Sequence, residues 1–342
     1  MKRFTRVILT AASTMLIALQ LIALPASAQE DTGGSGLQVS PATVPLELIP
    51  GQSQDVEFEV ANPTANPVII TPKVFDFSSD NSSGRAVLNT DVNAEDNPRS
   101  IRRYISGLES IELASGGKFT YVLNVSIPDG AIPGAYFGAV AFQAIPADDA
   151  VDSEGVAVVF NANVAPLILV TVLGDAVTDG IVKDVSAGNL KDAAGQLNND
   201  NIDRGSLFGS VPDTIVVEIE NTGETFLEPL GVMTVKNMFG GEIAVNVNSS
   251  IIKGSVLPGS TRVFVSEMKQ AIQSVEGTEE FKTIGGFGRF TVEGGIGLVN
   301  GGQTTDVRFT FWVIPAWLWI VLGAIVFTLV TFAYVTVRKF RG

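Results

Sequence analysis

Residues Asp55–Val60, with the sequence DVEFEV, alternate acidic and apolar side chains with a period of two. Successive side chains of a β-strand point to opposite faces, so this stretch predicts a strand with one face in a core and the other in water. The same alternation recurs in Phe119–Ile127 and Thr214–Glu220. Three further stretches are apolar on both faces, as central strands of a sandwich are: Ala135–Ile145, Val156–Phe160 and Pro166–Leu173.

The region 37–311 contains no convincing amphipathic helix, and Pro98–Ile105 allows at most a short helical turn. A tight turn followed by an alternating strand occurs three times, at Pro50-Gly51, Gly116-Gly117 and Pro258-Gly259. Glycine supplies the positive φ that such turns need. Strands joined by such corners are typical of Greek-key sandwiches of immunoglobulin type. We therefore predict an all-β fold with two tandem Ig-like Greek-key β-sandwiches.

The boundary between the two sandwiches is predicted at Gly174–Gly180, where small and polar residues follow a long apolar stretch. The first domain is then 37–174 and the second 180–312. Within the second, Lys191–Gly205 (KDAAGQLNNDNIDRG) is polar and is interpreted as a loop.

The N-terminal end has the pattern of a secretory signal peptide. Three basic residues precede the apolar stretch Val7–Leu24, and Ala26-Ser27-Ala28 is a small-residue cleavage site. Residues 1–28 are therefore predicted to be removed on export, with an uncleaved anchor as the alternative. Residues 29–36 are predicted to be a flexible lead-in, since they are rich in glycine and acid.

The C-terminal end predicts one transmembrane α-helix, at 315–337. Ala316–Val337 holds 22 residues without a charge, and at about 1.5 Å per residue such a helix spans roughly the thickness of a bilayer core. All three tryptophans (Trp312, Trp317, Trp319) stand at its start, as interfacial aromatic residues do. The tail 338–342 is basic, which predicts a cytoplasmic C-terminus. The protein is thus expected in the cell membrane, single-pass, with its N-terminus and ectodomain outside.

The composition excludes several functions. Apart from six basic residues at the two ends, the chain has 16 basic and 36 acidic residues, a net charge of −20. Such a domain repels phosphate backbones, so no nucleic-acid partner is expected. The chain has neither cysteine nor histidine, which removes disulfides, thiolate nucleophiles and the Ser-His-Asp machinery.

Three groups of acids are candidates for carboxylate chemistry: Asp76 with Asp80, the loop Asp148-Asp149-Asp152-Glu154, and Glu279-Glu280. A glycosidase needs one carboxyl with a raised pKa in a cleft, whereas these acids stand in polar, loop-like surroundings. We therefore expect no enzyme activity and no catalytic residues.

Metal and phosphate sites are not expected either. Asn199, Asn201 and Asp203 alternate like calcium ligands, but Arg204 and Ser210 stand where an EF-hand needs glycine and glutamate. The glycine groups Gly285–Gly288 and Gly294–Gly297 lack the helix that a phosphate cradle needs and are interpreted as hairpin turns and bulges. No cofactor and no metal are predicted.

The first predicted domain contains the motifs Leu37–Pro41 (LQVSP), Pro50-Gly51, Val60–Asn62 (VAN), Ile127-Pro128 and Pro133–Val140 (PGAYFGAV). The second contains Glu220–Pro229 (ENTGETFLEP), Val235–Gly240 (VKNMFG), Val256–Ser260 (VLPGS) and Phe311–Pro315 (FWVIP). Together these motifs resemble the WxL-interacting proteins, a family of bacterial surface proteins.

The resemblance implies a peptidoglycan-binding-type Ig-like domain, a second Ig-like domain and association with the cell envelope. It implies cell-wall polymer as a ligand of the first domain and a protein partner for the second. The matching positions are turn and core residues, so the ligand-binding residues stay unknown.

The function expected from the sequence is that of a non-enzymatic, membrane-anchored cell-surface protein that binds envelope components or other surface proteins, as an adhesin or envelope scaffold. Two alternatives remain open. One is an assembly chaperone-like docking protein for exported partners, which would lend a strand edge. The other is a carboxylate-dependent hydrolase of envelope glycans.

Overall fold

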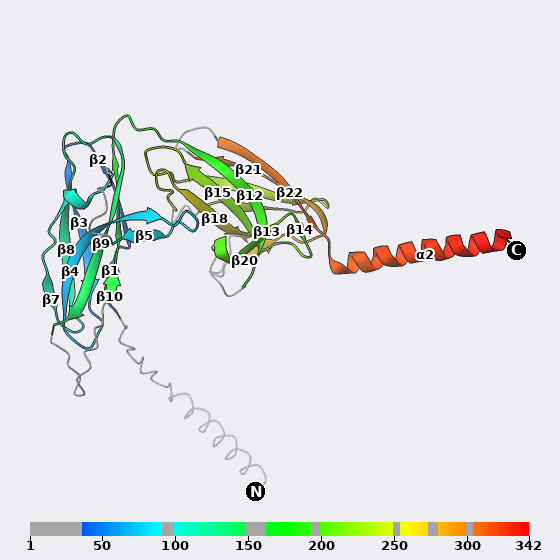
Figure 1. The fold of residues 1–342 in the computed structure, drawn as a ribbon, viewed down its shortest axis with the longest axis horizontal. Helices are drawn as coiled ribbons and strands as arrows, with labels where there is room; N and C mark the ends of the chain where they lie inside the picture. The colour runs from blue at the N-terminus through cyan, green and yellow to red at the C-terminus, as the bar shows by residue number, and fades with distance from the viewer. Residues whose placement is uncertain are drawn as a thin grey trace, which may run out of the picture.

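The computed structural model describes residues 36–90, 97, 99–147, 162–192, 199–248, 254–272, 280–298 and 304–341. The fold class predicted from the sequence is confirmed, because the chain forms two β-sandwiches followed by one apolar helix (Figure 1). The predicted signal peptide, the acidic loop at 148–154 and the strand predicted at Val156–Phe160 lie outside the described residues.

The first sandwich contains two sheets, with strand orders β1-β3-β8-β6 and β2-β11-β9-β4-β5; in the second sheet β10 also pairs with β9 and β7 with β4. Its elements are β1 (Gln38–Ser40), β2 (Thr43–Leu48), β3 (Ser53–Ala61), β4 (Val68–Ser79), β5 (Ala86–Asn89), the 3₁₀ turn η1 (Arg102–Tyr104), β6 (Ile105–Ser106), β7 (Ile111–Leu113), β8 (Lys118–Ser126), β9 (Gly134–Pro146), β10 (Ala162–Val164) and β11 (Leu167–Val172).

The core of the first sandwich follows from the alternation that opened the sequence. In β3 the side chains of Val56, Phe58 and Val60 are buried while the acids between them are exposed. Phe58 meets Phe142 of β9 edge to face, with ring centroids 5.8 Å apart. Side chains of period two from both sheets therefore fill one apolar layer, which is the main source of stability for a sandwich.

The second sandwich also has two sheets, with strand orders β13-β12-β15-β18 and β14-β22-β21-β16-β17, and a separate β19-β20 pair. Its elements are β12 (Gly180–Leu190), the 3₁₀ turn η2 (Asn199–Asn201), β13 (Ile202–Gly205), β14 (Leu207–Phe208), β15 (Thr214–Asn221), β16 (Leu230–Asn237), β17 (Glu242–Asn246), β18 (Thr261–Glu267), β19 (Lys269–Ile272), β20 (Glu280–Thr283), β21 (Gly288–Gly297) and β22 (Thr304–Val313).

Each sandwich has one corner built in the same way, around a buried asparagine. The amide nitrogen of Asn62 donates to the carbonyls of Leu113 and Ala114, at 3.2 and 3.1 Å. That of Asn221 donates to the carbonyls of Thr225 and Val256, both at 2.8 Å. Both side chains are only 1% exposed. The two asparagines therefore satisfy carbonyl groups that would otherwise be buried without a partner.

Three local predictions differ from the structure or are refined by it. The predicted loop Lys191–Gly205 contains strand β13, whose Ile202 is buried. The group Gly294–Gly297 lies within regular strand β21 and is not a turn. A Cβ on Gly294 would stand 2.2 Å from the carbonyl oxygen of Val232, so close approach of β16 explains that glycine. The short helical turn allowed at Pro98–Ile105 is confirmed as η1.

Helix α2 (Ala316–Arg341) follows β22 after only two residues, Ile314 and Pro315. Its segment Ala316–Phe340 has a mean hydropathy of 2.4 and none of it is buried against the sandwiches. By length and composition this helix can cross a bilayer. Figure 1 shows that α2 leaves the end of the second sandwich that faces away from the first.

Candidate binding cleft between the two sandwiches

The outer face of sheet β2-β11-β9-β4-β5 is apolar and turns toward the second sandwich. Phe137 of β9 contacts Phe77 of β4 and Phe226 of the second sandwich, with ring centroids 5.2 and 6.1 Å apart. Leu169 of β11 and Leu257 belong to the same apolar cluster. The cluster holds the two sandwiches together by burying apolar surface that an isolated domain would expose.

A polar contact at one end of this junction fixes the linker between the sandwiches. The amide of Ala135 donates to the carbonyl of Glu224 at 2.8 Å, and the amide of Val177 in the linker donates to the Glu224 carboxylate at 3.2 Å. Arg99 forms an ion pair with the same carboxylate at 3.4 Å and donates to the carbonyl of Pro133 at 2.8 Å. Glu224 therefore connects both sandwiches and the segment that joins them.

A second contact is made by the β4–β5 hairpin, which reaches from the first sandwich to the second (Figure 1). The carbonyl of Ser82 accepts a hydrogen bond from the amide of Val263 in edge strand β18, at 2.7 Å. Within the hairpin, Asp80 accepts hydrogen bonds from the amides of Ser82 and Gly84, at 3.0 and 2.9 Å. Burial would raise the pKa of Asp80, but hydrogen bonds from Ser83, Ser82 and Gly84 outweigh it and lower that pKa.

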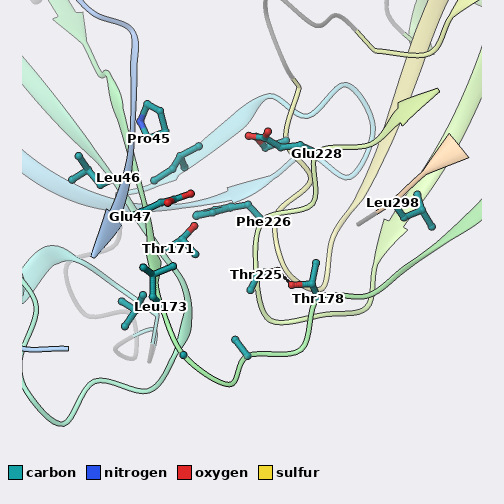
Figure 2. A pocket seen from close by; sticks show the side chains of 15 residues that line it. Pro45, Leu46, Glu47, Thr171, Leu173, Thr178, Thr225, Phe226, Glu228 and Leu298 are labelled. Atoms are coloured by element: carbon teal, nitrogen blue, oxygen red, sulfur yellow. Dashed lines mark hydrogen bonds between the residues drawn. The ribbon is translucent and has the colours of Figure 1, made fainter. Parts of the chain in front are cut away.

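Between these two contacts lies a cavity of about 390 Å³, lined by both sandwiches (Figure 2). Its volume is in the range of about 300–1,000 Å³ that is usual for ligand pockets. Its walls are mostly threonine and apolar side chains from β2, β11 and the second sandwich. The lining side chains that Figure 2 labels are Pro45, Leu46, Glu47, Thr171, Leu173, Thr178, Thr225, Phe226, Glu228 and Leu298.

The charges in this cavity are both negative. Glu47 comes from edge strand β2 and Glu228 from the second sandwich, and they are the two charged residues in the lining. Figure 2 shows the side chains of Glu47 and Phe226 pointing toward one another across the cavity, with Glu228 on the same side of the cavity as Phe226. The hydroxyl of Ser255 donates to Glu228 at 3.3 Å. Two carboxylates beside the apolar floor of the cavity, formed by Leu169 and Phe226, favour a ligand that is partly apolar and carries a positive charge.

The free edge of β2 borders the cavity. The amide of Leu167 donates to Ala42 and that of Leu173 donates to Leu48, so the even-numbered residues of this parallel pair face β11. Thr43, Pro45 and Glu47 then point their backbone groups to the free edge. Because Pro45 has no N–H, this edge offers acceptors more than donors, which hinders unselective strand pairing.

A second cavity, of about 330 Å³, lies beside the first and shares Leu169 and Ser255 with it. The charged residue in its lining is Arg262 of β18. Arg262 donates to the carbonyl of Ser255 at 2.9 Å and lies over the ring of Phe264, 5.3 Å from its centroid. Burial lowers its pKa, and the charge of Asp80 partly restores it. The two cavities thus differ in charge, with two carboxylates lining the first and a guanidinium lining the second.

Asp76 and Asp80, which the sequence analysis paired as candidate catalytic acids, have different partners in the structure. Asp76 lies in β4, is buried and forms an ion pair with Arg102 at 3.6 Å. Asp80 caps its own hairpin, and neither residue lines the two cavities. The loop acids at 148–154, Glu279 and the side chain of Glu280 lie outside the described residues.

The residues considered for calcium are engaged with protein groups. The side-chain oxygen of Asn199 accepts a hydrogen bond from Arg204. The same Arg204 forms ion pairs with Asp184 and Glu218 at 3.3 and 3.5 Å. A guanidinium therefore occupies the space beside Asn199, where a cation would be repelled.

Sequence reasoning missed the cleft, because its residues come from five separate parts of the chain with no shared motif. One available signal was Pro45 inside an otherwise strand-like segment, which marks an edge strand. Another was Phe226-Leu227 within a turn-rich segment, where large apolar residues need a covering surface.

No family model and no curated protein match the chain. The resemblance to the WxL-interacting proteins therefore stays a prediction. Among solved structures, the chain is similar to a structure described as a chaperone-tip adhesin complex of CFA/I fimbriae, with 9% identity over 82% of this chain and 99% of that one, and a TM-score of 0.36.

Two further similar structures are also described as containing a chaperone. The Salmonella enterica SafB chaperone with the SafA pilin shows 10% identity over 81% of this chain and 96% of that one, with a TM-score of 0.34. The Pseudomonas aeruginosa CupB2 chaperone shows 13% identity over 81% and 100%, with a TM-score of 0.32. At these identities and TM-scores the likeness gives no functional conclusion.

Proposed function

We propose that this protein is a non-enzymatic, membrane-anchored docking protein of the cell surface, which holds a segment of another exported protein in the cleft between its two sandwiches. The observation that carries the proposal is the cleft itself, with its apolar floor, its two carboxylates and the free edge of β2. This is the docking alternative of the sequence analysis combined with its membrane anchor.

The anchor in this proposal is α2, which crosses the membrane and leaves the sandwiches outside the cell. Support comes from its apolar composition, the exposure of its side chains and the basic residues Arg338, Lys339 and Arg341 at its end. The sandwiches then face exported proteins and wall material, and the N-terminal signal peptide predicted at 1–28 delivers them there.

The partner segment is extended, carries apolar side chains and has a lysine or arginine. Apolar side chains fit the floor formed by Leu169 and Phe226, and the cation lies between Glu47 and Glu228. Backbone donors of the segment meet the outward carbonyls of β2. Because Pro45 has no backbone N–H, a bound segment cannot form a complete ladder of hydrogen bonds with β2. Only segments that bind without a complete ladder fit this edge.

The test uses site-specific photo-cross-linking on intact cells, which the lack of native cysteine makes clean. Thr171→Cys places a maleimide-benzophenone probe in the cleft, and Thr120→Cys places the same probe on the exposed face of β8 as a matched control. We expect a small set of exported polypeptides attached at position 171 and absent at position 120.

Charge reversal shows whether the cleft selects its partner. Adding Glu47→Lys and Glu228→Lys to Thr171→Cys is expected to abolish the cross-links, whereas Glu57→Lys on the exposed face of β3 leaves them unchanged. The proposal is contradicted if the same polypeptides are cross-linked from positions 171 and 120. It is also contradicted if Glu47→Lys and Glu228→Lys leave the cross-links from position 171 unchanged. Attachment to wall polymer alone contradicts it in favour of the polymer ligand implied by the family resemblance.

A further inference from the structure

The end of the second sandwich beside α2 exposes large apolar side chains. Met238 and Phe239, in the turn between β16 and β17, are 62% and 59% exposed. Leu207 of β14 and Trp312 of β22 are 62% and 49% exposed. Such a group of exposed apolar side chains at one end of a domain marks a contact surface. We call this surface, together with Phe287 and Arg289, the juxtamembrane tip.

The tip is continuous with the first turn of α2 through aromatic contacts. Phe239 meets Phe287 edge to face, with ring centroids 5.1 Å apart. Phe287 in turn meets Trp317 of α2 edge to face, at 5.4 Å. Since only Ile314 and Pro315 join β22 to the helix, the tip lies at the level where α2 begins.

Sheet register places the tip side chains in one row. Leu207 stands opposite Trp312, and Trp312 stands opposite Arg289 in the next strand. Met238 lies beside Arg289, because the two residues line the same hollow. Residues directly opposite one another in a sheet project from the same face, so Leu207, Trp312 and Arg289 form one ridge.

Positive charge accompanies this ridge, although the ectodomain as a whole is acidic. Arg289, Lys236 and Arg308 line one shallow hollow of about 200 Å³ with Met238. Lys236 forms an ion pair with Glu293, a contact that raises the pKa of the lysine. Among the described residues Arg289 has no ion pair, and it is exposed. A free cation beside exposed aromatic and apolar side chains fits an anionic headgroup above acyl chains.

We propose that the juxtamembrane tip lies in the headgroup region of the outer leaflet, with Met238, Phe239 and Trp312 at the acyl boundary and Arg289 on an anionic headgroup. This contact rests on the proposed function, because it needs α2 to cross the bilayer. It fixes the tilt of the second sandwich against the membrane, and thereby the direction in which the cleft opens.

The test uses the full chain in lipid nanodiscs, with one spin label at a time on an engineered cysteine. Phe239→Cys reports on the tip, and Val122→Cys, an exposed apolar position on the first sandwich, is the matched control. Oxygen enters the bilayer and a nickel chelate stays in water. We expect the label at 239 to be several-fold more accessible to oxygen relative to the chelate than the label at 122.

Lipid charge tests the role of Arg289. Phosphatidylglycerol in the nanodisc is expected to increase the difference between the two labels, and Arg289→Gln is expected to remove that increase while leaving the difference in phosphatidylcholine unchanged. Equal accessibility at 239 and 122 overturns the proposal. The proposal is also overturned if the label at 239 is shielded from the nickel chelate only when a nanodisc holds two copies of the protein. In that case a second copy, and not lipid, covers the tip.

A third label separates this inference from the anchor itself. Val326→Cys lies within α2 and must report the hydrocarbon interior if the helix spans the membrane. Water accessibility at 326 contradicts the proposed anchor. Burial at 326 together with water accessibility at 239 contradicts only the contact of the tip with the lipid.

Discussion

The carbonyl oxygen of Ser82, at the tip of the β4–β5 hairpin, accepts a hydrogen bond of 2.7 Å from the amide of Val263 in β18. One sandwich thereby occupies the outer edge of a sheet in the other. Unpaired strand edges invite pairing with other chains, so this contact both protects β18 and orients the cleft.

Gly84→Ala is expected to loosen this junction. Gly84 has φ of +75°, and an added Cβ would stand 2.4 Å from the Nε of Arg262. Arg262 would have to move and lose its hydrogen bond to Ser255. We expect a lower melting temperature and a broader distance distribution between spin labels at positions 122 and 232, one in each sandwich.

Gly116→Ala is the matched control, because Gly116 has a similar φ of +68° and a Cβ there meets nothing within 4 Å. It should show only the backbone strain of a left-handed residue, about 1–2 kcal/mol, with the distance distribution unchanged. Equal distributions in the two variants would show that the hairpin does not set the orientation.

Asn62→Ala and Asn221→Ala are each expected to reduce the free energy of unfolding by about 1–3 kcal/mol, since each leaves buried carbonyls without a donor. Denaturant titration of the full chain in detergent measures the loss. Asn124→Ala, which removes an exposed hydrogen bond to Asp55, serves as the control and should change stability by less than about 0.5 kcal/mol. A loss at position 62 no larger than that at position 124 contradicts the role of the corner.

Acid should weaken the hairpin through Asp80. Its pKa is lower in the folded than in the unfolded protein, so its ionised form contributes stability above the unfolded value of 3.8, and this is lost as the pH falls through the folded value. The stability difference between the wild type and Asp80→Asn should therefore be largest at neutral pH and shrink in acid. Denaturation midpoints along a pH series measure it, and a difference independent of pH refutes it.

Alkali should act through Tyr121. Burial raises the pKa of its hydroxyl to about 12. Because the folded state favours the neutral phenol, the resulting stability is present below the unfolded value of 10 and is lost as the pH rises toward 12. Tyr121→Phe should lose less stability over that interval and lack the last step in a titration of tyrosine absorbance. If the transition at the highest pH is unchanged in Tyr121→Phe, that transition belongs to another of the four tyrosines, and the prediction is wrong.

Strand positions in the sandwiches could be predicted where polar and apolar residues alternate along the sequence. The alternation at Asp55–Val60 appears as β3, and Thr214–Glu220 appears as β15. The turns at Pro50-Gly51, Gly116-Gly117 and Pro258-Gly259 are confirmed, since Gly51, Gly116 and Gly259 all have positive φ. Local chemistry determines these features, so a single sequence contains them.

The candidate cleft could not be predicted from local sequence patterns, because it forms where a sheet of the first sandwich packs against the second sandwich. Leu169 and Phe226 are 57 positions apart in the sequence and meet only when the outer face of one sheet turns toward the other sandwich. Strand β13 was missed for a related reason. Its four residues hold one buried apolar side chain, Ile202, and pairing with β12 rather than local pattern makes them a strand.

The two-residue connection between β22 and α2 has a mechanical consequence. In the proposed function, a pull on a docked partner would pass to the membrane along β22, which is paired with β21 over its full length from Thr304 to Val313. A load along the axis of a paired strand is shared by all of its ladder bonds, whereas a load across it breaks them one after another. With α2 as the proposed anchor, its attachment would therefore resist a pull on the sandwiches as a shear joint does, with no flexible stalk between β22 and the helix to stretch first.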